Sequence, residues 1–195
     1  MKPECPKRMS SGKYIDLNNL TYDMLDISDI DTALNSITRF TGHWKDVPPL
    51  TVAQHLQLCL NIAEIFEPDD YELHLAVFVH DFAEAYIGDV ATPIKKAMGD
   101  RWYSFSLPIE SLVEQKFFGM KVDQELHDRV KLYDLAALDI ERRVMWRSQY
   151  GKDKWPACPL HIGTIEEKTE LFNMVCGDYV NVTEIWGKLF DKVAV

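Results

Sequence analysis

The chain has 195 residues, of which 47% are hydrophobic and 27% are charged, and its formal net charge is −10 at pH 7. This size and composition are typical of one globular domain with a buried core. The negative charge argues against binding to a nucleic-acid polymer, which requires a basic face, although a bound cation can still attract a small nucleotide.

The N-terminal part predicts a loose arm and then a helix. Residues 1–14 are polar and show no helical pattern. Apolar residues recur at helical spacing over residues 27–40, where Ser28 or Asp29 is the expected N-cap. Segment 41–49 ends in two prolines, which stop any helix.

Two strongly apolar helices follow, and they form the expected centre of the fold. The first covers residues 50–66 and is capped by Thr51. A turn separates it from the second, over residues 71–87, which is apolar enough to be central. Residues 88–99 are then expected to form a loop with a short turn.

The C-terminal half continues the helical pattern. Helices are predicted over residues 108–119 and 123–150, and a loop over 152–163. The last helix covers residues 164–190 and is expected to be broken near Gly177.

These elements predict the fold class. The chain lacks runs of β-branched residues with period two, so we expect an all-α helical bundle. We assign residues 1–195 to a single domain, with a core at about 27–147 and a C-terminal helical extension at 151–195.

Cysteine usage and the absence of targeting signals favour a cytoplasmic protein. The four cysteines form no C-x-x-C pair, so we interpret them as reduced thiols. The N-terminus does not resemble a secretory signal, and no run approaches the ~18 apolar residues of a membrane span. We expect no membrane contact.

The segment VHDFAEAYIGD, residues 79–89, contains side chains that a core helix does not need. His80 and Asp81 are adjacent, about 100° apart on a helix, so both can reach an ion lying between them. Glu84 follows one turn after His80 and lies over the same face. Each of these residues alone has an ordinary structural explanation, but their order suggests a metal site.

Two further polar residues lie in apolar surroundings on other predicted helices. His55 lies within VAQHLQLCL and Asp134 within VKLYDLAAL. Alone, His55 would be a core histidine, and Asp134 a partner of Arg142 or a surface acid. Buried charges are costly unless they are paired or bind a metal. One shared divalent ion of Mn, Co, Fe, Ni or Zn explains all of them.

The spelling of four segments resembles that of HD-domain phosphohydrolases, whose pattern is H…HD…D on a helical bundle. The chain is most similar to the branch of bacterial 5′-deoxynucleotidases and phage dATP triphosphohydrolases. The matching segments cover roughly residues 27–147: ITRFTGH (37–43), LTVAQH (50–55), VHDFAEAYIGDVATPIK (79–95) and VKLYDLAALDIERR (130–143).

The resemblance implies specific roles for residues of this chain. Glu84 would act on the attacking water or the leaving oxygen, and Asp89 would be a second catalytic acid. Arg39 and Lys95 would contact the phosphates. The implied metal ligands are His55, His80, Asp81 and Asp134.

The base and sugar pocket is less defined by the motifs. Phe40, His43 and Trp44 follow Arg39 in an irregular segment, and an aromatic ring there can stack on a nucleobase. Packing in the core or in a lid explains Phe40 and Trp44 equally well. dATP-specific relatives are expected to place a bulky aliphatic residue here, whereas this chain has Thr41-Gly42, so base preference stays open.

The basic segment ERRVMWR, residues 141–147, has two readings. It can be a phosphate-contacting surface. We favour a solvated helix face in which Glu141 pairs with the neighbouring arginines, which also complement the negative end of the helix dipole.

The expected function is hydrolysis of deoxynucleotides by a metal-dependent phosphohydrolase. We favour a dNTP triphosphohydrolase that prefers dATP and belongs to a phage or prophage nucleotide pool, hence in the host cytoplasm. Alternatives are a 5′-deoxynucleotidase acting on dNMPs, a hydrolase of cyclic dinucleotides or alarmones, and a catalytically inactive nucleotide-binding module. We expect a homo-oligomer, because relatives of this kind assemble.

Overall fold

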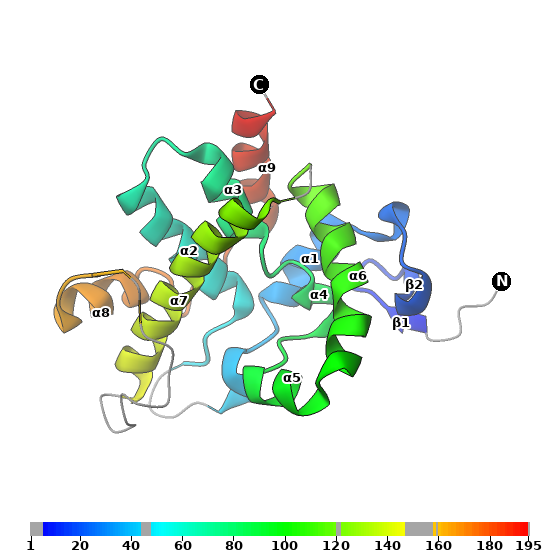
Figure 1. The fold of residues 1–195 in the computed structure, drawn as a ribbon, viewed down its shortest axis with the longest axis horizontal. Coiled ribbons are helices and arrows are strands. Elements are labelled where there is room, and N and C mark those ends of the chain that lie inside the picture. Colours follow the sequence, from blue (N-terminus) through cyan, green and yellow to red (C-terminus); the bar gives the residue numbers. More distant parts are fainter. Residues whose placement is uncertain (1–5, 44–47, 120–121, 147–157, 159, 195) are drawn as a thin grey trace.

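The computed structural model is an all-α helical bundle, as predicted (Figure 1). It describes residues 6–43, 48–119, 122–146, 158 and 160–194. Helices α2 (Val52–Phe66), α3 (Tyr71–Val79) and α7 (Gln124–Trp146) pack against one another at the centre. The other helices lie around them: α1 (Ile27–Leu34), α4 (Glu84–Ile87), α5 (Thr92–Met98), α6 (Asp100–Phe117), α8 (Ile165–Asn173) and α9 (Val182–Val193).

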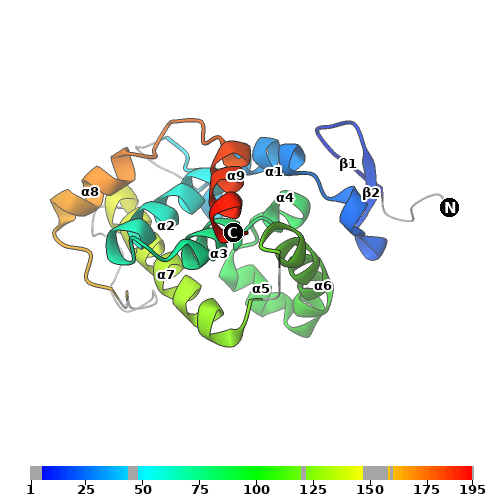
Figure 2. The same ribbon diagram turned by 90° about the horizontal axis from the view of Figure 1, so that it is seen from above.

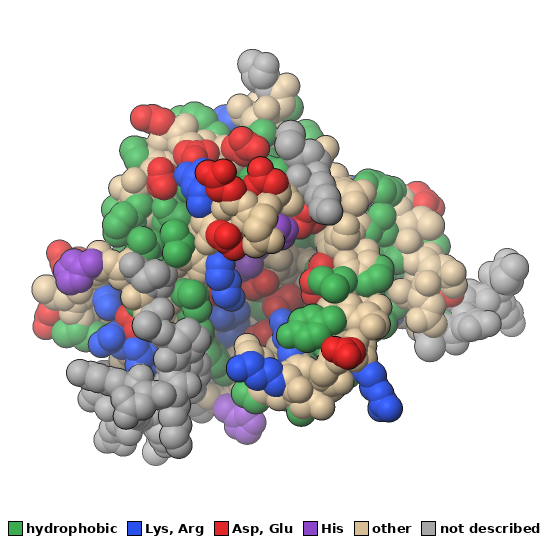
Figure 3. Space-filling model, viewed as in Figure 1, with side chains coloured by type: hydrophobic (Ala, Val, Ile, Leu, Met, Phe, Trp, Pro, Cys, Tyr) green, Lys and Arg blue, Asp and Glu red, His purple; other side chains and the backbone are tan. Residues whose placement is uncertain are grey.

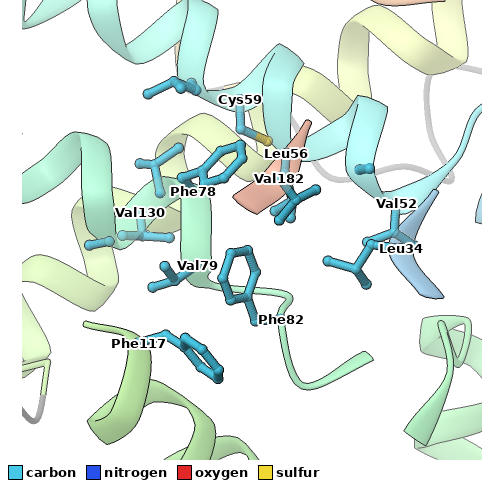
Figure 4. Close-up of a cluster of buried hydrophobic side chains, with 14 of the residues drawn as sticks. Leu34, Val52, Leu56, Cys59, Phe78, Val79, Phe82, Phe117, Val130 and Val182 are labelled. Carbon is cyan, nitrogen blue, oxygen red and sulfur yellow. The ribbon is translucent and has the colours of Figure 1, made fainter. Parts of the chain in front are cut away.

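Helix α3 is enclosed on all sides, as its almost continuous apolar sequence requires. Every side chain from Leu73 to Val79 is buried. Helices α2 and α7 contact α3, and α9 packs on it from the side seen in Figure 2. Phe82 meets Phe78 and Phe117 edge to face, with ring centroids 5.8 and 5.6 Å away (Figure 4). These aromatic contacts join α3 to α6 and fix the segment that follows α3.

Helix α2 confirms its prediction, including the cap. The Thr51 side chain accepts a hydrogen bond from the amide of Gln54, and the Gln54 side chain accepts one from the amide of Thr51. This reciprocal arrangement satisfies two donors that a helix start leaves unpaired. It fixes the first turn of α2, directly before His55.

The helix predicted over residues 27–40 is shorter than expected and is capped differently. Helix α1 ends at Leu34, and Asp26 caps it in place of Ser28 or Asp29. Residues Arg39–Gly42 form a short 3-10 segment in which Phe40 and Thr41 have φ of 55° and 56°. Residues other than glycine rarely adopt this left-handed backbone conformation, which costs about 1 kcal/mol or more per residue.

The cap of α1 gives a testable contribution to stability. Replacing Asp26 by Ala removes its hydrogen bonds to the amide and hydroxyl of Ser28 and to Lys13. The free energy of unfolding at pH 7 should fall by about 1 kcal/mol, as measured by urea denaturation. Asp26→Asn keeps a capping oxygen, so its loss should be smaller.

The effect of Asp26 should also depend on pH. Lys13, and then Ser28, lower the pKa of this carboxyl from 3.8 to about 2 in the folded protein. Because the folded pKa is below the unfolded one, the charge contributes stability above pH 3.8. That contribution is lost as the pH falls through about 2. If the free energy of unfolding differed between wild type and Asp26→Ala by the same amount down to pH 2, the lowered pKa of Asp26 would be contradicted.

The helix predicted over residues 71–87 is divided into two. Helix α3 ends at Val79, and α4 begins at Glu84. Between them the amides of Phe82, Glu84 and Ala85 donate to carbonyls three residues earlier, not four. This tighter turn interrupts the α-helix. It places His80 and Asp81 at a helix end, not on a continuous helical face.

The N-terminal arm is ordered over its described part, so the prediction of a loose arm is wrong there. Strand β1 (Pro6–Arg8) pairs antiparallel with β2 (Tyr14–Asp16). Lys7 donates to the carbonyls of Ala85 and Tyr86 at the end of α4. These long-range contacts explain why local sequence gave no signal for the hairpin.

The prediction of a loop over residues 88–99 misses α5. Helix α6 also begins earlier than predicted, at Asp100, because Pro108 lies within it and not at its start. Proline is common at the first position of a helix, which made residue 108 look like a beginning. Gly99, with φ of 58°, separates the two helices.

The C-terminal region packs on the central helices. The helix predicted over residues 164–190 consists of α8 and α9, and the break lies around Gly177, as expected. Helix α8 contacts α7, while α9 contacts α3 and α1. Residues 147–150 of the predicted long helix, and most of the loop at 152–163, lie outside the described residues. In the described parts, no helix is both long and apolar enough to cross a lipid bilayer.

Candidate metal centre

His55 lies at the centre of a buried network between α2 and α7. Its side chain is fully buried, and Nδ1 lies 2.6 Å from Oε1 of Glu141. The other ring nitrogen, Nε2, faces two acids. Oδ1 of Asp134 is 3.4 Å from it, and Oδ2 of Asp81 is 3.8 Å from it. One nitrogen of the ring is therefore held by the protein, and the other points at two predicted ligands.

His80 is oriented in a similar way by the end of α3. Its Nδ1 donates a hydrogen bond of 2.7 Å to the carbonyl of Val77. Its Nε2 is buried and has no hydrogen-bond partner among the described residues, although Oδ2 of Asp81 lies 3.3 Å away. Buried polar atoms are almost always partnered. The unpaired Nε2 is therefore the atom most easily explained by a ligand.

The described residues contain a cluster that can hold a metal ion. One donor atom each from His55, Cys59 and His80 lies within 4.8 Å of the others. The two imidazole rings are 5.7 Å apart between centroids. Imidazole and thiolate donors suit transition metals such as zinc, cobalt or copper.

Cys59 was not identified as a site residue from the sequence. It follows His55 by one helical turn, and its Sγ lies 3.5 Å from Nε2 of that histidine. Burial raises the pKa of the thiol. The spacing i, i+4 after a buried histidine was the available signal.

The pKa values of the acids around the two histidines are shifted in different directions. Burial opposes ionisation of Asp81, but His80 and His55 lower its pKa below the usual value. Burial likewise opposes ionisation of Asp134, while His55 lowers its pKa further. For Glu84, burial and then Asp81 raise the pKa well above normal. The pKa shift of Glu84 is thus opposite in direction to those of Asp81 and Asp134, a pattern typical of sites that use separate acid and base groups.

A cavity of about 290 Å³ opens beside these groups. Figure 3 shows the hollow between the sides formed by α7 and α6, with acidic side chains at its floor and basic ones at its edges. Glu84 lines it, and the Oε2 atom of Glu84 is buried without a partner. Lining residues from the predicted site are His80, Asp81, Glu84, Lys95 and Asp134, beside apolar residues such as Val79, Val113 and Trp102.

Of the predicted substrate-binding residues that the structure describes, one lines the cavity and the others do not. Lys95 lines the cavity, with its Nζ 5.7 Å from the centroid of the Trp102 ring. Phe40 lies against Arg39, whose Cζ is 5.5 Å from the ring centroid. His43 is exposed. Trp44 lies outside the described residues.

The pKa values of Arg39 and Asp89 are both shifted by burial and by charged groups of the site. Arg39 is only 9% exposed; its Nε donates to Glu141 over 3.1 Å, and its Nη1 lies 3.9 Å from Asp81. Burial disfavours the charged guanidinium, but Glu141 and Asp81 raise its pKa. Burial also raises the pKa of Asp89, while Arg39 lowers it.

The expectation that Glu141 belongs to a solvated helix face is wrong. Its side chain is fully buried between His55 and Arg39. The neighbouring Arg142 and Arg143 pair with Asp139 instead. Glu141 follows Asp134 by two helical turns on α7, so both face the same side, and that periodicity was the signal in the sequence.

Comparison with known proteins finds relatives without a described activity. No family model matches the chain. The chain is 28% identical over 165 residues to the uncharacterized protein YfdR of Escherichia coli strain K12, covering 85% of this chain and 82% of that protein. It is 30% identical over 112 residues to the uncharacterized protein RCAP_rcc00048 of Rhodobacter capsulatus, covering 57% of each. Neither name states an activity, so the comparison assigns none to this chain.

Proposed function

We propose that the protein is an HD-type, metal-dependent phosphohydrolase of deoxynucleotides, with a dNTP, and dATP first, as substrate. One observation supports this most strongly. His55 on α2, His80 and Asp81 after α3, and Asp134 on α7 lie within 3.3 to 3.8 Å of one another in successive pairs. The motif positions are thus neighbours, although they are up to 79 residues apart in sequence.

The residues fit a divalent transition metal. Two imidazole nitrogens and two carboxylates form a mixed donor set typical of such ions. The buried Nε2 of His80 has no hydrogen-bond partner among the described residues. We propose that His55, His80, Asp81 and Asp134 hold Co, Mn, Zn, Ni or Fe. When bound, such an ion neutralises phosphate charge and acidifies water.

The remaining side chains supply proton transfer and positioning. Hydrolysis joins a water oxygen to the α-phosphorus and breaks the bond from that phosphorus to the 5′-oxygen. The leaving 5′-oxygen must gain a proton, and the proton that the attacking water loses replaces the one that the acid has given up. Glu84 is suited to give that proton, because burial raises the pKa of its carboxyl and its Oε2, at the cavity, has no hydrogen-bond partner among the described residues. Lys95 lines the cavity and can hold a phosphate oxygen. Asp89, whose carboxyl pKa is raised by burial, is the proposed second acid.

A product assay tests the proposal. Protein stripped of metal and reloaded with Co²⁺ or Mn²⁺ is incubated with dAMP, dATP, dGTP, dTTP and their ribose counterparts, and the products are separated by chromatography. We expect deoxyadenosine and intact triphosphate from dATP, and no product from the metal-free protein. The dGTP reaction measures purine preference.

The same assay separates the alternatives. Phosphate released from dAMP, with the dNTPs untouched, would replace the triphosphohydrolase by a 5′-deoxynucleotidase. If every nucleotide survived while the protein held a metal, the proposed activity would be rejected, and the site would be a nucleotide-binding site or act on another substrate.

A further inference from the structure

We infer that Glu141 and Arg39 form one positioning unit, which holds His55 so that its Nε2 keeps a lone pair for the metal. This inference rests on the proposed metal site. It assigns Arg39 a role inside the protein, distinct from the phosphate contact implied by the resemblance.

The hydrogen bonds fix which nitrogen of His55 carries a hydrogen. An ionised carboxylate only accepts hydrogen bonds, and a guanidinium only donates them. Glu141 accepts from Arg39 Nε at 3.1 Å with Oε2, and its Oε1 lies 2.6 Å from His55 Nδ1. Nδ1 must therefore be the donor. In the neutral ring, Nε2 then has the free lone pair that a metal requires.

The unit is buried, so its partners cannot be replaced by water at low cost. Glu141 and His55 are fully buried. A carboxylate in such a place needs an opposite charge, and Arg39 supplies it. Carboxylates bound to the outer nitrogen of metal-bound histidines orient the ring and raise its basicity, and their loss typically weakens metal binding about 10- to 100-fold.

Glu141→Gln is an informative change because it keeps size and shape. His55 and Arg39 face different oxygens of Glu141, and glutamine has an oxygen at only one of these two places. If the oxygen faces Arg39, the amide NH₂ faces Nδ1 of His55, and the ring must carry its hydrogen on Nε2. If the oxygen faces His55, two donors face each other at Arg39. Either arrangement should weaken metal binding.

The experiment measures the affinity of the metal-free protein for Co²⁺ by competition with a chromophoric chelator, together with its melting temperature. We expect Glu141→Ala and Glu141→Gln to bind Co²⁺ about 10- to 100-fold more weakly than the wild type. Removing the competing donor in Arg39→Met with Glu141→Gln lets the amide oxygen turn to His55. This double variant should bind Co²⁺ more tightly than Glu141→Gln alone.

Asp139→Asn is the matched control. Asp139 is also a buried carboxylate of α7, paired with Arg142, Arg143 and Lys168. Its loss should lower the melting temperature and leave Co²⁺ affinity within about twofold of the wild type. A general effect of removing a buried acid is thereby separated from an effect on His55.

The outcomes distinguish this inference from the proposed function. If the wild type binds no Co²⁺, both are overturned. If the wild type binds Co²⁺ and folded Glu141→Gln binds it equally well, only the positioning role is overturned. If Glu141→Ala does not fold, Glu141→Gln decides. Failure of the double variant to recover affinity would exclude Arg39 from the unit.

Discussion

Asp81→Ala is expected to abolish metal binding and the proposed phosphohydrolase activity together. Asp81 lies 3.3 Å from Nε2 of His80 and 3.8 Å from Nε2 of His55. Its carboxylate is the charged group between the two imidazoles, and a site without it loses an anionic donor. Co²⁺ binding and turnover of dATP, measured on the same preparations, should both fall to background.

The control is Asp128→Ala, which removes an exposed acid of α7. It should change neither Co²⁺ binding nor turnover. Full metal occupancy in folded Asp81→Ala would show that other donors, such as Cys59, hold the ion without this carboxylate. The proposed ligand set would then be wrong.

Glu84→Ala should retain the metal and lose turnover by roughly 100-fold or more, the range of a general acid or base. Glu84 is 7% exposed and lines the cavity with an unpartnered Oε2. Within the described residues, the ion pairs that His55 and His80 make involve Asp81, Asp134 and Glu141, and not Glu84. Its removal should therefore not change the proposed ligand set.

The check is single-turnover hydrolysis at saturating Co²⁺, with metal content measured in parallel. Glu84→Gln keeps the shape of the side chain and cannot give up a proton in the same way, so it should be impaired as well. Normal turnover in metal-loaded Glu84→Ala would remove the proton-transfer role. A loss of metal would instead place Glu84 among the ligands.

The sequence predicted best where local rules dominate. Helix α2 has both a capping residue at Thr51 and helical periodicity, and the structure agrees. Helix α3 was predicted too long because its apolar sequence continues through Phe82 and Ala85, whereas the backbone tightens after Val79. The hairpin of residues 6–16 contacts α4 through Lys7, a long-range contact that no local pattern reveals.

The residues of the candidate site also include some that the sequence predicted and some that it did not. The four ligand positions could be proposed because each is a polar residue in apolar surroundings, and the family resemblance gave their order. Glu141 was misassigned because its partners lie far away in sequence: His55 is 86 residues before it and Arg39 is 102 residues before it. Charged neighbours along α7 made a surface role look sufficient, and only tertiary packing shows the burial.

Helix α7 carries Asp134 and Glu141 two turns apart, one toward each side of the His55 ring. Each residue of an α-helix advances the side-chain direction by about 100°. One residue inserted between positions 134 and 141 would leave the helix intact and turn one carboxylate away from the histidine. The number of residues between Asp134 and Glu141 is therefore set by the two contacts that His55 makes.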